Sequence, residues 1–475
     1  MADSPLWTPE ELVAATGGRI EGTVTTALNG VSIDSRNITA GDIFVAIKGE
    51  NHDGHDFAAA ACEAGAGLAV VSRVTDAMRP AGPLLVVAED PLRGLENIGR
   101  ASRARSHAQI VGVTGSVGKT STKEMLRAAL SASGMTHASA ASFNNHWGVP
   151  LTLARMTRET AYGVFEIGMN HAGEITPLVG MVRPHVAIIT NIAQSHLGHF
   201  SSLEGIADAK AEIFSGIMPR GHALINRDNP YFDRLADAAR QAGVNSIVGF
   251  GRHRDAEIRL ERLVLHGECC CITASVLGED LIYKLGVPGE HMAMNSLGVL
   301  GAVKLMGADL ARGSLALAAV AAAKGRGVRQ RLEAPGGDIM LIDESYNANP
   351  ASVRAALALL ANAKPGRGGR RVAVLGDMLE LGQQGAHLHG ELAEPVDAAR
   401  VDTLYAAGPL MAHLWARTPV PRQGAYAETS DGLREALVSG LRAGDIVMVK
   451  GSLGSRMGPL VEAIRTAYPP RRMSD

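Results

Sequence analysis

Short apolar runs alternate along the chain with segments of helical periodicity. Runs rich in Val, Ile and Leu at residues 109–114, 162–167 and 186–190 predict buried strands. In residues 92–105 and 202–214, apolar positions recur three and four residues apart, which predicts helices that bury one face. Strands that alternate with helices favour a parallel sheet covered by helices on both faces.

The same alternation continues on either side of this central segment. Before residue 88 it predicts a small α/β module, with strands at residues 28–34, 43–47, 68–71 and 84–87 and a helix at 57–65. After Gly327 it predicts a Rossmann-like α/β domain, with strands at residues 339–343, 371–375, 403–406 and 446–450 and helices at 352–361 and 433–441. The central segment adds a strand at residues 222–225, an antiparallel ribbon within 256–285 and helices at 292–306 and 310–323.

The predicted fold class is therefore α/β with three domains. We expect an N-terminal module over residues 1–88, a central domain with a P-loop-type parallel sheet over 89–326, and a C-terminal domain over 327–475. The length of 475 residues agrees with a division into several domains, because a single hydrophobic core rarely serves a chain that long.

Composition and charge limit the class of protein and the partners that it can bind. Hydrophobic residues make up 46% of the chain and charged residues 20%, the balance of a soluble globular protein. A net charge of −2 gives no general field for nucleic acid or for a membrane surface. The first ten residues contain no apolar signal region, and no apolar run reaches about eighteen residues. We expect a cytoplasmic monomer that binds neither nucleic acid nor a membrane.

The strongest chemical signal follows the strand at residues 109–114. The sequence Thr114-Gly-Ser-Val-Gly-Lys-Thr-Ser places a glycine-rich turn between a strand and a helix. Backbone N–H groups of such a turn surround phosphate oxygens, while Lys119 would reach the β- and γ-phosphates and Thr120 would ligate Mg²⁺. Val113 stands where the strict motif has Gly, so this is a variant loop. The alternative is a structural turn with an incidental lysine.

Two further residues follow central strands. Glu166 ends an apolar strand, and His196 follows the strand at 186–190. A Glu in that place is a costly buried charge unless a cation pairs with it, and a divalent ion beside ATP would supply one. Taken alone, each is more often a structural group. Lys210 lies on an amphipathic helix and, taken alone, is interpreted as a solvated surface lysine.

Polar clusters also follow strands in the outer domains. Asp343, Asn347 and Asn349 lie between a strand and a helix, where they would contact a nucleotide or peptide or simply cap the helix. Lys450 and Ser452 follow another C-terminal strand. In the first module, Ser35 and Arg36 follow a strand and would bind a phosphate-bearing ligand, with a solvated surface loop as the alternative.

Several of these motifs together resemble the Mur ligase family, in the order in which that family carries them. They are Thr114-Gly-Ser-Val-Gly-Lys-Thr-Ser, Phe143-Asn-Asn-His-Trp-Gly-Val-Pro, Glu166-Ile-Gly-Met-Asn-His, His196, Ala209-Lys-Ala-Glu-Ile-Phe and Asp343-Glu-Ser-Tyr-Asn-Ala-Asn-Pro. The last motif, together with Gly376-Asp-Met-Leu-Glu-Leu-Gly, is similar to the branch of the family that adds D-alanyl-D-alanine to UDP-N-acetylmuramoyl-tripeptide.

The resemblance implies roles for particular residues. The ATP site would comprise Thr114, Gly115, Ser116, Val117, Gly118, Lys119, Thr120, Ser121, Asn295, Arg331 and Asp343. Mg²⁺ would be held by Thr120, Glu166, His196 and Lys210 as a carbamate, and Lys119, His196 and Lys210 would be the catalytic residues. The substrates would contact Ser35, Arg36, Asn144, Asn145, Asn347, Asn349, Lys450 and Ser452.

The implied reaction is ATP-dependent formation of an amide through an acyl phosphate. Three alternatives stay open on the sequence alone. The first is another Mur-type or folylpolyglutamate-type ligase, the second a P-loop kinase or regulatory NTPase, and the third a non-catalytic nucleotide-binding module.

Overall fold

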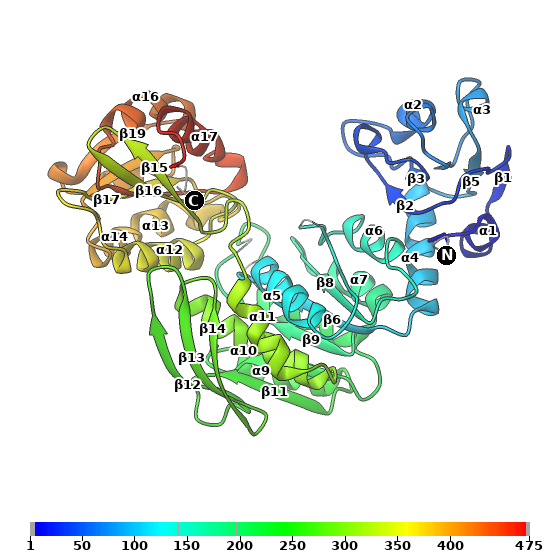
Figure 1. Cartoon of the computed structure of the whole chain (residues 1–475), viewed down its shortest axis with the longest axis horizontal. Coiled ribbons are helices and arrows are strands. Elements are labelled where there is room, and N and C mark those ends of the chain that lie inside the picture. The colour runs from blue at the N-terminus through cyan, green and yellow to red at the C-terminus, as the bar shows by residue number, and fades with distance from the viewer. Residues whose placement is uncertain (1–4, 141, 196, 201, 472–475) are drawn as a thin grey trace.

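Three sheets, one for each third of the molecule, organise the chain. The computed structural model describes residues 5–140, 142–195, 197–200 and 202–471. The sheets have five, nine and six strands and follow one another along an elongated molecule, with the N-terminal sheet at one end and the C-terminal sheet at the other (Figure 1). No helix in these ranges is long and apolar enough to cross a membrane.

The N-terminal sheet has the order β1-β5-β4-β3-β2. Its strands β2 to β5 are parallel and β1 is antiparallel. The strands are β1 (Arg19–Glu21), β2 (Gly30–Ser32), β3 (Asp42–Val45), β4 (Leu68–Val71) and β5 (Leu84–Val86), and the helices are α1 (Pro9–Thr16), α2 (Ala58–Glu63) and α3 (Met78–Ala81).

This module is fixed to the central domain by packing and hydrogen bonds. Leu95 of α4 (Pro91–Arg105) and Leu151 of α6 (Gly148–Ala154) share its apolar core. The indole Nε1 of Trp7 donates to the carbonyl of Ala154 at 2.8 Å, and Arg155 Nε donates to the carbonyl of Val31.

The central sheet has the order β14-β13-β12-β11-β10-β9-β6-β8-β7. Its strands are β6 (Gln109–Thr114), β7 (Thr136–Ala138), β8 (Tyr162–Glu166), β9 (Val186–Ile189), β10 (His222–Asn226), β11 (Ser246–Gly251), β12 (Ile258–Leu265), β13 (Cys270–Val276) and β14 (Glu279–Leu285). Strands β6 to β12 pair in parallel, while β12, β13 and β14 form an antiparallel ribbon.

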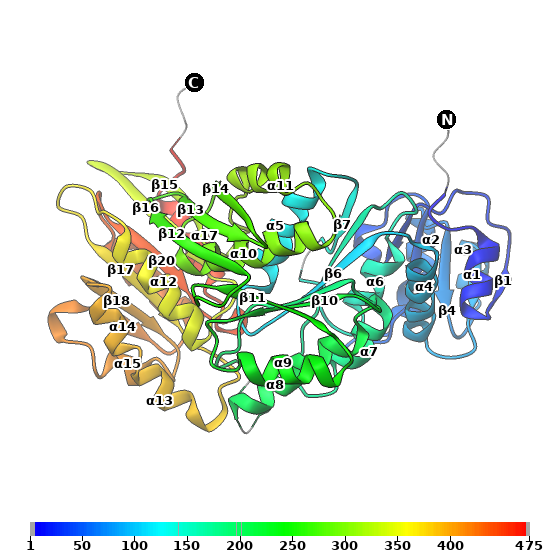
Figure 2. The same cartoon turned by 90° about the horizontal axis from the view of Figure 1, so that it is seen from below.

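Helices bury both faces of the central sheet, so its strands are apolar on both sides. Figure 2 shows α5 (Lys119–Ser131), α10 (Glu290–Leu305) and α11 (Leu310–Ala316) on one face. On the other face lie α7 (Ile175–Val182), α8 (Leu203–Ala211) and α9 (Phe232–Gln241).

The C-terminal sheet has the order β15-β16-β20-β17-β18-β19, parallel except for β15. Its strands are β15 (Val328–Ala334), β16 (Gly337–Glu344), β17 (Arg371–Gly376), β18 (Thr403–Ala407), β19 (Gln423–Ala427) and β20 (Ile446–Lys450). The helices are α12 (Pro350–Asn362), α13 (Gly385–Gly390), α14 (Ala393–Ala398), α15 (Ala412–Trp415), α16 (Ser430–Gly440) and α17 (Gly458–Ala467), and they bury two apolar cores.

The fold class and the antiparallel ribbon predicted from the sequence are confirmed. The helix expected over residues 310–323 is wrong in its second half. Helix α11 ends at Ala316, a single 3-10 turn covers Leu317–Ala319, and Val320 is extended. The residue boundaries of the three domains stay a prediction.

Candidate active site

A tight turn joins β6 to α5 at the centre of the central sheet. Strand β6 lies between β8 and β9, and α5 begins at Lys119. Gly115 and Gly118 have φ of +147° and +88°. A Cβ on Gly115 would lie 1.9 Å from Thr190 Oγ1, and one on Gly118 would lie 2.4 Å from Asn295 Nδ2. Only glycine meets both constraints at each position.

The turn is attached to the segment that follows β9. Ser116 donates from its backbone N–H to the carbonyl of Asn191 at 2.8 Å, and its Oγ donates to the carbonyl of Ala193 at 2.9 Å. The Thr190 hydroxyl donates to the carbonyl of Val117 at 2.6 Å. These bonds hold the backbone in one conformation before any ligand arrives.

Lys119 is a partly buried cation poised over this turn. Its Nζ donates to the carbonyl of Gly115 at 2.7 Å. Loss of hydration lowers the pKa of Lys119, the Glu166 carboxylate opposes that shift, and Arg326 adds to it. An anion placed beside Nζ would stabilise the charged ammonium, as a phosphate would.

Glu166, at the end of β8, is 2% exposed and held from two sides. Thr120 Oγ1 donates to one carboxylate oxygen at 2.8 Å, and Asn144 Nδ2 donates to the other at 2.7 Å. A buried carboxylate beside a hydroxyl offers the hard oxygen donors that Mg²⁺ takes in addition to phosphate and water. The residues present therefore fit such an ion, although the described residues include no group of three His, Cys, Asp or Glu side chains with metal-ligand geometry.

Lys210 is buried, with 1% of its surface exposed, so its interpretation as a solvated lysine is wrong. Burial lowers the pKa of its ammonium well below the usual value, and repulsion from Lys119 lowers it further. The neutral amine is the form that reacts with CO₂. His196, predicted as the other catalytic ligand, lies outside the described residues.

A cavity of about 310 Å³ separates this turn from the C-terminal domain. Lys119, Thr120, Asn144 and Glu166 line one side. Glu344, Tyr346, Asn347, Asn349 and Lys450 line the other, where the parallel neighbours β16 and β20 end at one edge. The predicted phosphate turn therefore faces three of the predicted acceptor residues, Asn347, Asn349 and Lys450, whereas Ser452 does not line the cavity.

Several lining residues were missed by the sequence reasoning. The Arg326 guanidinium lies 4.1 Å from the centre of the Tyr346 ring and donates to Ser142 Oγ at 3.3 Å. Glu344 accepts a hydrogen bond from Lys450 Nζ at 3.3 Å. Arg326 and Ser142 sit in loops where no recognisable motif singles them out, whereas Glu344 and Tyr346 lie inside the motif at residues 343–350 but were given no role there.

The C-terminal acceptor residues also have local structural partners. Lys450 Nζ donates to the carbonyl of Asn347 at 3.0 Å. Asn349 caps α12 reciprocally with Ser352, so the helix-capping interpretation holds for it even though it lines the cavity. Ser452 Oγ donates to the carbonyl of Ala348 and accepts from the backbone N–H of Leu379 at 2.9 Å.

Five predicted nucleotide residues do not line this cavity: Thr114 and Gly115, which lie at the base of the turn, and Asn295, Arg331 and Asp343. Asn295 lines an adjoining cavity of about 380 Å³ beside Val117. Arg331 lines another cavity, of about 610 Å³, between the β12–β13 turn and the C-terminal domain. Asp343 is buried against Arg465, 3.5 Å away, and accepts from Ser345 Oγ.

The remaining substrate residues lie toward the N-terminal module. Asn145 accepts from the backbone N–H of Gly148 at the start of α6. Ser35 and Arg36 lie on a 3-10 turn after β2, and the Arg36 guanidinium makes a bidentate contact with Asp34. This contact lowers the pKa of the Asp34 carboxyl to about 2.

Fold and site together define a three-domain α/β enzyme whose glycine-rich turn on the central sheet faces a Rossmann-like C-terminal domain across one cavity. Models of known protein families match all three domains of the chain. The catalytic domain of the Mur ligase family matches residues 27–108, the Mur ligase middle domain 113–303, and the glutamate ligase domain of Mur ligases 330–453. The chain belongs to the Mur ligase family.

Individual relatives agree over nearly the whole length. The UDP-N-acetylmuramoyl-tripeptide–D-alanyl-D-alanine ligase of Escherichia coli is 34% identical over 470 residues, covering 96% of this chain and 98% of the relative. A crystal structure of MurF from Acinetobacter baumannii superposes with a TM-score of 0.84 at 29% identity, covering 97% and 99%. MurF of Thermotoga maritima in complex with ADP shares the fold, with a TM-score of 0.76 at 24% identity, covering 93% and 98%.

Proposed function

We propose that this protein is an ATP-dependent ligase that joins D-alanyl-D-alanine to UDP-N-acetylmuramoyl-tripeptide. One observation carries the proposal: Lys119 and the Thr120–Glu166–Asn144 cluster face Glu344, Asn347 and Lys450 across a single cavity. A phosphate donor on one side and an amine acceptor on the other would meet there. The full-length likeness to relatives of that name supports this choice of substrates.

The reaction proceeds in two balanced steps. A carboxylate oxygen of the tripeptide attacks the γ-phosphorus of ATP, and ADP leaves. The amine of D-alanyl-D-alanine then attacks the resulting acyl phosphate, loses a proton and expels inorganic phosphate. Little covalent chemistry is asked of the protein, so positioning and charge stabilisation dominate. Lys119 neutralises the transferring phosphoryl group, and the backbone N–H groups of the turn orient it.

Magnesium ions would be held by Thr120 and Glu166, together with His196 and carbamylated Lys210. Bound there, the metal would supply further neutralisation of phosphate charge. Lys210 prepares for carbamylation through its burial, since its neutral Nζ attacks the carbon of CO₂ and releases a proton. The carbamate turns a neutral amine into an anionic oxygen donor.

Each of the three domains contributes some of the remaining substrate contacts. Asn295 faces the adenine, and Arg331 and Asp343 reach the nucleotide when the C-terminal domain rotates further. Ser35 and Arg36 bind the UDP moiety, and Asn144 and Asn145 lie toward the muramoyl peptide. Asn347, Asn349, Lys450 and Ser452 receive the dipeptide. The enzyme works as a cytoplasmic monomer.

A reconstituted reaction tests the function and the loop assignment together. Purified protein is incubated with UDP-muramoyl-tripeptide, D-alanyl-D-alanine and MgATP, and pentapeptide is measured by mass. We expect Lys119→Ala to lower the rate by about a thousandfold or more, because the phosphoryl charge loses its nearest cation. Lys284→Ala, at an exposed site on β14, is the matched control and should keep wild-type activity.

The alternative from a different enzyme class predicts a different result in this assay. A kinase or regulatory NTPase would consume ATP without forming the amide. Substantial ligation by the Lys119→Ala enzyme would refute the role of the turn.

A further inference from the structure

Three strands of the N-terminal sheet end side by side. Strands β2, β3 and β4 are adjacent and parallel, so the segments after them lie at one edge of the sheet. Ligands bind at this edge in open parallel sheets. The first segment carries Ser35 and Arg36, the second an exposed turn with Lys48, and the third Ser72 and Arg73.

Three side chains connect the second segment to the third. Asp53 Oδ1 contacts His55 Nδ1 at 2.7 Å. On the other side of the ring, His55 Nε2 accepts from the backbone N–H of Ser72 at 3.0 Å and lies 3.2 Å from Ser72 Oγ. The His55 side chain is only 3% exposed, whereas that of Asp53 is 19% exposed.

The hydrogen bonds determine the tautomer of His55. A backbone N–H can only donate, so Nε2 must be the unprotonated nitrogen, and the ring proton lies on Nδ1 and points at Asp53. The ring is thus neutral and fixed at both nitrogens. Although Asp, His and Ser line up as in a hydrolase, the backbone N–H already occupies Nε2, and Ser72 lines none of the cavities described above. The cluster therefore positions other groups.

What the cluster positions is the turn between residues 47 and 54. This turn closes on itself through a bridge between Lys48 and Asp53 and a hydrogen bond from Gly54 N–H to the carbonyl of Ile47 at 2.9 Å. A Cβ on Gly54 would lie 2.5 Å from the backbone of Ala46, so the base of the turn is tightly packed. Asp53 also forms an ion pair with Arg73, 3.0 Å away. Asp53 therefore contacts both the turn that carries Lys48 and the side chain of Arg73.

We propose that Asp53, His55 and Ser72 form a positioning relay, which presents Lys48 and Arg73 beside Ser35 and Arg36 to the diphosphate of the nucleotide-sugar substrate. The relay rests on the proposed function, because that function supplies the diphosphate. Neither Asp53 nor His55 touches the reacting atoms. Both act through the orientation of the turn, so their loss weakens the binding of one substrate.

Two substitutions at His55 break the relay at opposite ends. His55→Gln can still accept from the Ser72 N–H but loses Asp53, and His55→Asn can still reach Asp53 but loses Ser72. We expect KM for UDP-muramoyl-tripeptide to rise in both variants. The rise should be about tenfold for His55→Gln, which loses a hydrogen bond to the charged Asp53, and about fivefold for His55→Asn, which loses a neutral one. KM for ATP and for D-alanyl-D-alanine should not change, and kcat should stay within about twofold. A merely structural role would reduce the amount of folded enzyme, and so kcat, and leave every KM unchanged.

His222→Gln is the matched control. The Nδ1 of His222 contacts Ser246 Oγ at 2.7 Å at the opposite, amino-terminal edge of the central sheet, so the same type of pair is lost away from the substrates. All three KM values should stay at the wild-type level in this variant. If both His55 variants keep the wild-type KM for the nucleotide-sugar, or raise all three KM values alike, the relay is wrong. If the wild-type enzyme makes no pentapeptide, the proposed function itself fails.

Discussion

Two lysines near the phosphate turn show how a side chain acquires its chemistry from its surroundings. Lys119 and Lys210 repel each other, and burial lowers the pKa of both. Glu166 attracts Lys119, which favours its charged form, whereas burial and Lys119 are the causes that act on Lys210. The same residue type therefore serves as a cation in one place and as a reactive amine in the other.

The buried amine of Lys210 lowers the folding stability of the protein, although its proposed function requires that burial. We expect Lys210→Met to raise the melting temperature in carbonate-free buffer, because an apolar side chain of similar size avoids the cost of burying an amine. The folded-state pKa of Lys210 is lowered, so the unfolded chain binds more protons and wild-type stability falls as the pH drops from about 10. The gain in melting temperature should widen in that direction, while ligation falls by about a hundredfold or more.

Thermal unfolding at several pH values and the ligation assay measure the two effects. A Lys210→Met enzyme that melts earlier than wild type and still ligates would contradict both.

The sequence predicted residues that belong to a motif and missed those whose role depends on burial or on the third dimension. The strand–turn–helix at Thr114 to Thr120 was predictable because glycines, lysine and threonine coincide locally. The burial of Lys210 was not, because it lies on an amphipathic helix close to the charged residues Asp208 and Glu212, and the sequence does not show which face carries the lysine. Arg326 reaches the cavity through packing between domains, which leaves no local pattern. Glu344 lies inside the motif at residues 343–350, but the sequence alone does not show which side chains of that motif face the cavity.

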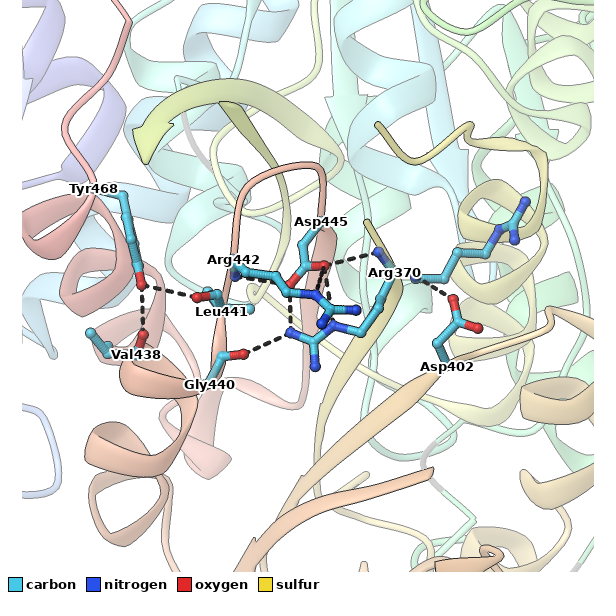
Figure 3. Close-up of polar contacts among 9 residues, drawn as sticks. Arg370, Asp402, Val438, Gly440, Leu441, Arg442, Asp445 and Tyr468 are labelled. Carbon is cyan, nitrogen blue, oxygen red and sulfur yellow. Dashed lines mark hydrogen bonds and ion pairs between the residues drawn. The ribbon is translucent and has the colours of Figure 1, made fainter. Parts of the chain in front are cut away.

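Among elements, the two edges of the C-terminal sheet have different tasks. Glu344 and Lys450, at the carboxyl ends of β16 and β20, line the cavity. At the amino ends of β17 and β20, a buried ion-pair cluster fastens the chain (Figure 3). Asp445, fully buried, accepts from Arg370 Nη2 at 2.7 Å, from the Arg370 N–H at 2.9 Å and from the Arg442 N–H at 3.0 Å.

Removing the charge at Asp445 should reduce stability without changing substrate binding. We expect Asp445→Asn to lower the free energy of unfolding of the C-terminal domain by about 2–4 kcal/mol, because Arg370 then loses its buried partner. Asp431→Asn, which breaks an exposed pair with Arg434 on α16, should change it by less than about 0.5 kcal/mol. Denaturant unfolding of both variants measures these free energies. An equal loss of unfolding free energy in the two variants would show that the burial of Asp445 does not contribute to stability.

The elements that the sequence missed are explained by their neighbours. Strand β15 is the antiparallel edge of a sheet that was expected to be parallel, and it is held by its hairpin with β16. The helix predicted over 310–323 stops early although alanine favours helix, because Val320 is extended and residues 320–323 line the interdomain cavity instead. Tertiary contacts override propensity in both cases.

At the scale of the whole molecule, one loop of the central domain contacts the C-terminal domain close to both halves of the site. Leu197 packs against the apolar cores of the two domains. The backbone N–H of Gly198 donates to the carbonyl of Glu380 at 2.8 Å, and a Cβ on Gly382 would lie 3.0 Å from the Cα of Gly198. The C-terminal loop that contains Glu380 is also bonded to Ser452, because the N–H of Leu379 donates to Ser452 Oγ. The contact with Gly198 therefore links the position of the central domain to that of Ser452.

Shortening Leu197 should loosen this domain contact while each domain stays folded. Half-burial of a leucine contributes about 1 kcal/mol, so we expect Leu197→Ala to lower kcat for ligation about fivefold through a smaller closed population. Small-angle scattering of the apo variant should give a larger radius of gyration than wild type, with little change in melting temperature. Leu315→Ala, at a site on α11 that is 75% exposed, is the control and should match wild type in all three measurements. A Leu197→Ala enzyme with wild-type kcat and scattering would mean that the C-terminal domain is held in place by its other contacts, and that Leu197 merely fills the space between two cores.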